Sequence, residues 1–387
     1  MVNKKLYKPI EITIATFESD ESWTVGTANA TQFKTGAQSL KVTSTNGALN
    51  TSALVFSGTN DYSAGAYFEI DVYIHDIVKT AGVSFALVKD AGATNYSTKS
   101  FTTLVQGWNR LRVNKEDMTF NGTFVAADYA GVKQARVGVQ AMAGNDCDAS
   151  FDNLRNVQRK AQFFLEFDDG LITVFSDALP IIESYGFKIG YLLITNKVGA
   201  ADPNYESWAN VLTMQSRGHV IGFHAHAAED YSDNTYAQIV ADMQLGQAKL
   251  RAEGINEPYH YAASQGKVNG SVALIQPLMF TSGRRHTHPS TFGYHDIPSD
   301  PWAQWGQVFA NTTILGTAQG WIDDAITQQR GCALVGHHMD ENNVDGNGVS
   351  DAFLDGVCSY LQSKQTAGLC EVVTREAMIA AFDARGS

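Results

Sequence analysis

The chain has 387 residues, enough for two domains with separate hydrophobic cores, and 44% of them are hydrophobic. It contains no run of about 18 apolar residues, so no membrane-spanning helix is expected. The formal net charge of −12 argues against a nucleic-acid partner, which needs a basic surface.

The chain begins with two lysines in Met1–Leu6, but no apolar segment follows them, and no signal peptide is visible. We therefore expect a cytosolic protein, a mature fragment or a protein exported without a cleaved signal. The cysteines show no CxxC spacing, so a thiolate zinc site is not expected. Buried free thiols are favoured for all four, with a Cys358–Cys370 disulfide left open.

The first part of the chain, residues 1–156, is predicted to be an all-β sandwich. Short alternating stretches recur between clusters of Gly, Asn, Asp and Ser, which is the pattern of regular strands and turns. The predicted strands are Ile12–Thr16, Ser39–Thr43, Ala66–Tyr73, Gly82–Val88, Trp108–Val113 and Ala135–Ala141. No long amphipathic helix is visible in this part.

The polar segment Arg155–Lys160 is predicted to be a linker, and the pattern changes after it. In residues 161–387, apolar strands alternate with helical patterns, which predicts a parallel sheet with covering helices, doubly wound or barrel-like. The strands are predicted at Phe163–Phe167, Ile189–Leu193, His219–Phe223, Ala333–Gly336 and Glu371–Val373. Nine of the ten histidines lie between His219 and His338, which indicates a polar site in this domain.

Three predicted strand ends carry groups that can perform chemistry. Asp168-Asp169-Gly170 follows the first strand, and His224 and His226 follow the third. His337 and His338 follow a late strand. Carboxyl ends of parallel strands form the active-site rim, where paired carboxylates and imidazoles can bind a metal and transfer protons. Each group alone is better explained as an acidic turn or as surface histidines, and His219, at the opposite strand end, is expected to be structural.

Together these segments resemble the polysaccharide deacetylase family, carbohydrate esterase family four. The resemblance runs in family order over residues 161 to 385. It is carried by Phe167–Gly170, Gly218–His224, Tyr261–Gly266 (without the family's prolines), Val335–His337 and Val373–Ala377. It implies a distorted, incomplete (β/α) barrel that hydrolyses N- or O-acetyl groups on an acetylated polysaccharide or oligosaccharide.

The resemblance also implies roles for individual residues. Asp168 would be the general base, Asp169 and His224 ligands of a divalent metal, and His337 the general acid. The metal would be zinc, with cobalt or nickel as alternatives, and a metal-bound water would be the nucleophile. The backbone N–H of Gln265 would help to stabilise the oxyanion.

Two positions depart from the family pattern. Ala228 stands where the family has a second histidine ligand, and His226, Glu229 or Asp230 could take its place. The arginine that pairs with the base in the third motif is absent, and Arg284 or Arg285 could restore that pairing. A sugar-stacking wall is expected from the aromatic and His-rich segment that contains His288, Trp302 and Trp305.

The first domain resembles carbohydrate-binding jelly-roll modules, through Phe17–Asp20, Gly36–Val42 and Phe151–Leu154. The resemblance implies a structural calcium, for which Glu18 and Asp152 are the proposed ligands. A sandwich that only spaces or docks the enzyme is equally compatible with the sequence. The rival to a deacetylase as a whole is a non-catalytic glycan-binding or virion surface protein with a decayed fold. For either function, an extracellular or surface location is expected, including that of a virion component.

Overall fold

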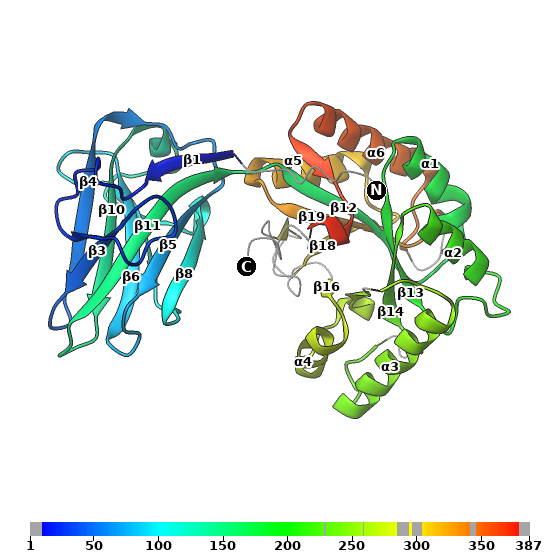
Figure 1. Cartoon of the computed structure of the whole chain (residues 1–387). Coiled ribbons are helices and arrows are strands. Elements are labelled where there is room, and N and C mark those ends of the chain that lie inside the picture. Colours follow the sequence, from blue (N-terminus) through cyan, green and yellow to red (C-terminus); the bar gives the residue numbers. More distant parts are fainter. Residues whose placement is uncertain are drawn as a thin grey trace. The chain divides into compact units, whose positions relative to one another are not determined.

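The computed structural model describes residues 10–227, 230–257, 259–284, 294–295, 304–340 and 346–378. The chain forms two compact units, Met1–Arg159 and Lys160–Ser387 (Figure 1). The prediction of a linker at Arg155–Lys160 was wrong for most of that segment, because Arg155–Gln158 are part of strand β11 (Cys147–Gln158). Three of those four residues are polar, but all four pair with β1 (Ile10–Ala15) or β5 (Tyr67–Ile74).

The first unit consists of two antiparallel sheets. The strand order in one sheet is β2 (Thr27–Asn29), β3 (Ser39–Ser44), β11, β5 and β8 (Gly107–Asn114), with β1 paired to β11. The order in the other is β4 (Leu49–Asn60), β10 (Val132–Ala141), β6 (Thr80–Val88), β7 (Tyr96–Phe101) and β9 (Thr119–Asn121). Apolar residues of both sheets form one buried core, which confirms a β-sandwich.

The alternation of strand side chains explains this sandwich. In β5, Phe68, Ile70, Val72 and Ile74 face the core. The opposite face of β5 carries polar residues that are nevertheless buried. There Glu69 is 3% exposed, and its carboxylate accepts hydrogen bonds from the guanidinium groups of Arg112 and Arg155. The central strand β11 was missed because polar residues occupy much of its length.

The second unit is a nearly closed barrel of parallel strands. The strands are adjacent in the order β16 (Ser282–Arg284), β15 (His260–Ala262), β14 (Val220–Ala225), β13 (Ile189–Ile194), β12 (Ala161–Phe167), β19 (Gly331–Gly336) and β18 (Gly306–Val308). A parallel bridge between Arg284 and Gln304 joins β16 to the segment that leads into β18. Strand β20 (Cys370–Val372) pairs with the start of β12, and β17 (Tyr294–His295) pairs antiparallel with β19.

Six α-helices are described around this barrel (Figure 1). They are α1 (Leu179–Ser184), α2 (Trp208–Ser216), α3 (Tyr236–Ala252), α4 (Gly270–Met279), α5 (Leu315–Gln328) and α6 (Asp351–Thr366). Their apolar faces form the main core with outward-facing strand residues such as Phe163, Leu165 and Phe167. None of the helices in the described ranges is long and apolar enough to cross a membrane. All four cysteines are buried free thiols, so Cys358 and Cys370 form no disulfide.

Candidate active site

The site residues continue the inward-facing rows of the barrel strands. Phe164 of β12 packs inside the barrel with Ala333 and Val335 of β19, apart from the main core. Because side chains on one face of a strand recur every second residue, these rows continue to Asp168 and His337 just past the strand ends. The ladder also continues there, since the Asp168 N–H donates to the Gly336 carbonyl.

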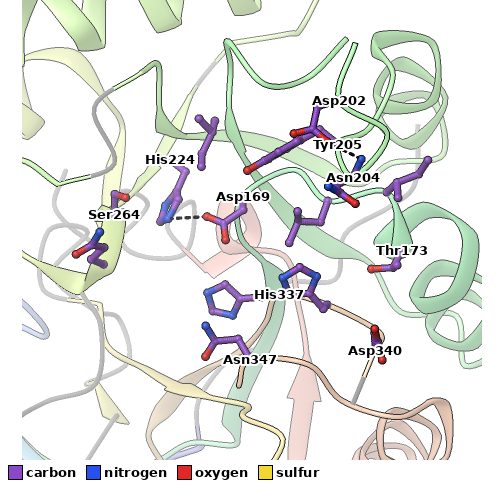
Figure 2. A pocket seen from close by; sticks show the side chains of 15 residues that line it. Asp169, Thr173, Asp202, Asn204, Tyr205, His224, Ser264, His337, Asp340 and Asn347 are labelled. Carbon is purple, nitrogen blue, oxygen red and sulfur yellow. Dashed lines mark hydrogen bonds and ion pairs between the residues drawn. The ribbon is translucent and has the colours of Figure 1, made fainter. Parts of the chain in front are cut away.

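A cavity of about 750 Å³ opens at these carboxyl ends of the strands (Figure 2). Its lining is mainly polar and includes the predicted Asp169, His224, Gln265 and His337. The remaining lining residues are Leu171, Ile172, Thr173, Ile194, Asp202, Asn204, Tyr205, Ser264, His338, Asp340 and Asn347. Residues from all three strand ends that the sequence singled out therefore meet in one cavity, although Asp168 and His226 are not among its lining residues.

Asp169 and His224 form a carboxylate–imidazole pair in this cavity. The Asp169 Oδ1 lies 3.4 Å from the His224 Nε2, and the ring points toward the carboxylate in Figure 2. The His224 Nδ1 lies 2.9 Å from the carbonyl oxygen of Ala262, which is an acceptor only. Nδ1 must therefore carry the proton, and the lone pair of a neutral imidazole is on Nε2, facing Asp169. Asp169 itself has a φ of 73°, in a sharp turn completed by Gly170 with a φ of 84°.

Asp168 lies in the wall behind this pair. Its side chain is buried, and one nitrogen of Arg284, Nη2, donates to Oδ1 at 2.5 Å and to Oδ2 at 2.6 Å. Burial raises the pKa of the Asp168 carboxyl, but the Arg284 guanidinium, with His224 and His337, outweighs burial and holds that pKa well below its usual range. Asp168 is therefore ionised at neutral pH. The predicted pairing of Asp168 with an arginine of the next strand end is present, and Arg284 provides it.

His337 lies on the other side of the carboxylates. Its Nε2 is 4.0 Å from the Asp168 Oδ2, and its ring lines the cavity. Burial lowers the pKa of His337, while the charges of Asp168 and Asp169 act in the opposite direction. At a distance of 4.0 Å from Asp168, the imidazole is close enough to exchange a proton with a group bound beside that carboxylate.

The structure does not bring His226 to the pair formed by Asp169 and His224. The His226 Nδ1 lies 2.8 Å from the Thr195 hydroxyl, and its backbone N–H donates to Asp242. Asp230 forms an ion pair with Lys267. Among the described residues no group of three or more His, Cys, Asp or Glu side chains could hold a metal ion. Ala228 and Glu229 lie outside the described residues.

The other predicted site residues are divided between the cavity and positions outside it. Gln265 lines the cavity in the turn Ser264–Gly266, with a φ of 50°. Trp305 is half-buried next to β18 and is not among the cavity residues, so the predicted stacking wall is not confirmed there. Arg285, His288 and Trp302 lie outside the described residues.

His219 has the structural role that was expected. Its Nδ1 accepts the N–H of Ile189, and its Nε2 lies 3.0 Å from Glu183, away from the cavity.

The structure adds two charged residues that the sequence analysis missed. Glu166 in β12 and Arg375 after β20 are 1% and 2% exposed, and both join the network around Arg284. A glutamate inside the otherwise apolar Phe163–Phe167 stretch was the available signal. This glutamate shows that one face of β12 lies in the barrel interior, while the other face packs in the main core between strands and helices.

In the first unit, Glu18 and Asp152 both bind backbone N–H groups of one loop, residues 34–38. Asp152 accepts from Lys34 and Thr35, and Glu18 accepts from Ala37. Oxygen atoms that were proposed as calcium ligands thus already act as hydrogen-bond acceptors, and the described residues show no metal-ligand cluster here. The structure therefore gives these carboxylates a loop-fixing role.

A nearly closed parallel barrel with a polar cavity at its carboxyl strand ends is the architecture of a barrel enzyme. Residues 155–278 match the family model described as polysaccharide deacetylase. The second unit therefore contains a polysaccharide deacetylase domain, the domain of a carbohydrate-deacetylating hydrolase. The match includes Asp168, Asp169 and His224, whereas His337 lies beyond it.

Several solved structures show similarity at low identity. The Xyl-CE4 domain of a multidomain xylanase from the hindgut metagenome of Trinervitermes trinervoides is 13% identical, with a TM-score of 0.40, over 59% of this chain and 92% of that one. A family 4 acetyl xylan esterase from Clostridium thermocellum, with a cobalt ion, is 15% identical, with a TM-score of 0.41, over 58% and 92%. A family 11 carbohydrate-binding module from Clostridium thermocellum is 11% identical, with a TM-score of 0.32, over 38% and 95%. The comparison with curated proteins gave no match.

Proposed function

We propose that the second unit removes N- or O-linked acetyl groups from a polysaccharide in a metal-dependent hydrolysis. The observation that carries this proposal is the meeting of Asp169, His224 and His337 in one cavity, with the ionised Asp168 directly behind them. A deacetylase needs a base, an acid and an electrophile around one carbonyl carbon. Asp168 and His337 would supply the base and the acid, and Asp169 and His224 would supply ligands for a metal ion that acts as the electrophile.

The chemistry of the donor set fits a divalent metal held by Asp169 and His224. The Ala262 carbonyl fixes the tautomer of His224 so that Nε2 can act as a ligand, and a carboxylate oxygen lies 3.4 Å from it. When bound, zinc, cobalt or nickel would polarise the acetyl carbonyl and lower the pKa of a coordinated water. Two protein ligands predict weak binding.

The protein groups would then divide the proton transfers between them. Asp168 takes the proton of the attacking water, since its carboxylate is ionised at neutral pH. The N–H of Gln265 donates to the oxyanion of the tetrahedral intermediate, an interaction worth about 3 kcal/mol. His337 gives a proton to the leaving nitrogen or oxygen. Because burial lowers the pKa of His337, we expect it to be neutral in the resting enzyme and to gain this proton during turnover.

Acetate release tests the activity, and metal titration tests the ligands. We expect release from at least one of acetylated xylan, chitin oligomers or acetylated bacterial polysaccharide with added zinc, cobalt or nickel. Asp169→Ala and His224→Ala should lose cobalt binding, whereas Asp168→Asn should keep the metal and lose turnover. His226→Ala is the matched histidine control and should keep both. Equal cobalt binding by the wild type and Asp169→Ala would overturn the ligand assignment.

For the first unit we propose saccharide binding at a hollow of about 400 Å³ on the sheet that contains β2, β3 and β5. Its lining offers hydrogen-bonding groups beside the ring of Tyr73, whose centroid lies 5.5 Å from that of Trp108 in an edge-to-face contact. Sugars bind through such rings and polar groups. Tyr73→Ala should weaken retention on insoluble polysaccharide and leave acetate release from a soluble oligomer unchanged. Unchanged retention would contradict this role.

A further inference from the structure

Four charged side chains are buried together beneath the candidate site. Glu166, Asp168, Arg284 and Arg375 are each at most 2% exposed, and the two carboxylates balance the two guanidinium groups. Charges this deep persist only when each is paired and hydrogen-bonded. None of the four is among the residues that line the cavity, and of the four only Asp168 has a role proposed above.

Glu166 fixes the orientation of Arg284. The Glu166 Oε2 accepts the Arg284 Nε–H at 2.6 Å, on one side of the guanidinium, while Nη2 donates to both oxygens of Asp168. A planar guanidinium held through two different nitrogen atoms cannot rotate about its stem, so the direction of Nη2 is set by Glu166. Space for Glu166 comes from Gly190 of the neighbouring strand, where a Cβ atom would lie 2.8 Å from Oε1.

Arg375 holds Glu166 in turn. Its Nη2 donates to the same Oε2 of Glu166 that accepts from Arg284, and its Nη1 donates to the carbonyl oxygen of Tyr261 at 2.8 Å. The Tyr261 carbonyl belongs to strand β15 and the Arg284 backbone to β16, so this chain of contacts ties three barrel strands to one carboxylate. Glu166 is thus held between two guanidinium groups that are themselves anchored.

We propose that Glu166 and Arg375 are positioning residues for deacetylation, acting through Arg284 on the direction of the Asp168 carboxylate. This role rests on the proposed function. The network also accounts for the relocation of the arginine partner of the base, because an arginine on β16 needs a second carboxylate inside the barrel to direct it toward Asp168.

The test compares Glu166→Gln with Arg375→Lys in the full chain, using acetate release from whichever substrate the wild type accepts. Each variant should lower kcat by about tenfold or more, as expected for a slightly misdirected catalytic group. The KM and the cobalt affinity should stay within about twofold, because neither residue lies in the cavity. Glu69→Gln is the matched control, since it removes a buried carboxylate from between two guanidinium groups in the first unit and should leave kcat unchanged.

A variant cycle separates positioning from a purely structural role. In the Asp168→Asn background, Glu166→Gln should cause no further fall in the residual rate, because both changes act on the same group. Unchanged kcat in folded Glu166→Gln, or losses that multiply in the double variant, would overturn the proposal. If Glu166→Gln does not fold, Arg375→Lys decides by the same criteria. If the wild type releases acetate and both variants have the same kcat as the wild type, the positioning role is refuted but the proposed function is not. If the wild type is inactive, the proposed function is refuted, and this role with it.

Discussion

Replacing Arg284 by methionine is the sharpest perturbation of the barrel interior. The guanidinium is completely buried and donates three hydrogen bonds to two carboxylates, those of Glu166 and Asp168. Methionine keeps an unbranched apolar side chain of similar reach, so the change removes the charge and its donors with little loss of packing. Glu166 retains Arg375 as a partner, whereas Asp168 loses its only arginine contact among the described residues.

The burial of this ion pair determines how much the free energy of unfolding should fall. Removing one partner from a buried ion pair costs about 3–5 kcal/mol, because the remaining charge has neither water nor a counterion. That is a large share of the roughly 5–15 kcal/mol that stabilises a domain. The loss should also depend on pH. Arg284 holds the folded-state pKa of Asp168 below its unfolded value, so its stabilising effect is full above a pH of about 4 and is lost as the pH falls further.

Urea unfolding of the wild type and Arg284→Met, at neutral pH and near pH 3, measures this loss. Arg284→Met combined with Asp168→Asn should recover at least about 1 kcal/mol, because the unpaired charge is gone. Arg110→Met in the first unit is the matched control. The Arg110 side chain is 43% exposed, and its ion pair with Asp71 should be worth at most about 1 kcal/mol. A loss below about 1 kcal/mol for Arg284→Met, or a loss independent of pH, would refute this account of the network.

Two further predictions concern packing and acid stability. Gly246→Ala should destabilise the second unit by about 1–3 kcal/mol in urea unfolding, because the new Cβ would lie 2.0 Å from the Phe223 ring; an unchanged midpoint would contradict the close approach of α3 to β14. Burial raises the pKa of Glu69, but two arginines lower it from 4.5 to about 2. The stability that this carboxylate contributes should therefore be lost as the pH falls from 4.5 to about 2, and the advantage of wild type over Glu69→Gln should shrink across that range; a constant difference would show that Glu69 gains nothing from its ionised form.

Much of the candidate site could be predicted because barrel strands obey two simple rules. Carboxyl ends of parallel strands meet on one face, and side chains alternate between the interior and the core. Those rules, with the family resemblance, predicted that Asp169, His224 and His337 lie in one site. The sequence also narrowed the expected ion-pair partner of Asp168 to two arginines, and the structure shows Arg284 as that partner.

What could not be predicted depends on residues with weak local signals. Strands β15, β16 and β18 have three residues each, too short for a period to show. Polar side chains in β11 and β12 are satisfied by partners far away in sequence, such as Glu69 with Arg155 and Glu166 with Arg375. His226 has the right chemistry for a metal ligand, but a hydroxyl group binds it instead.

Acetate release by the wild type and by Asp168→Asn, at equal cobalt content, tests the central claim most directly. The account predicts that the wild type releases acetate from an acetylated saccharide, and that Asp168→Asn is folded and binds cobalt but is at least about 100-fold slower, the contribution of a general base. No release by the cobalt-loaded wild type from any acetylated polysaccharide, or equal rates for the two proteins, would contradict it.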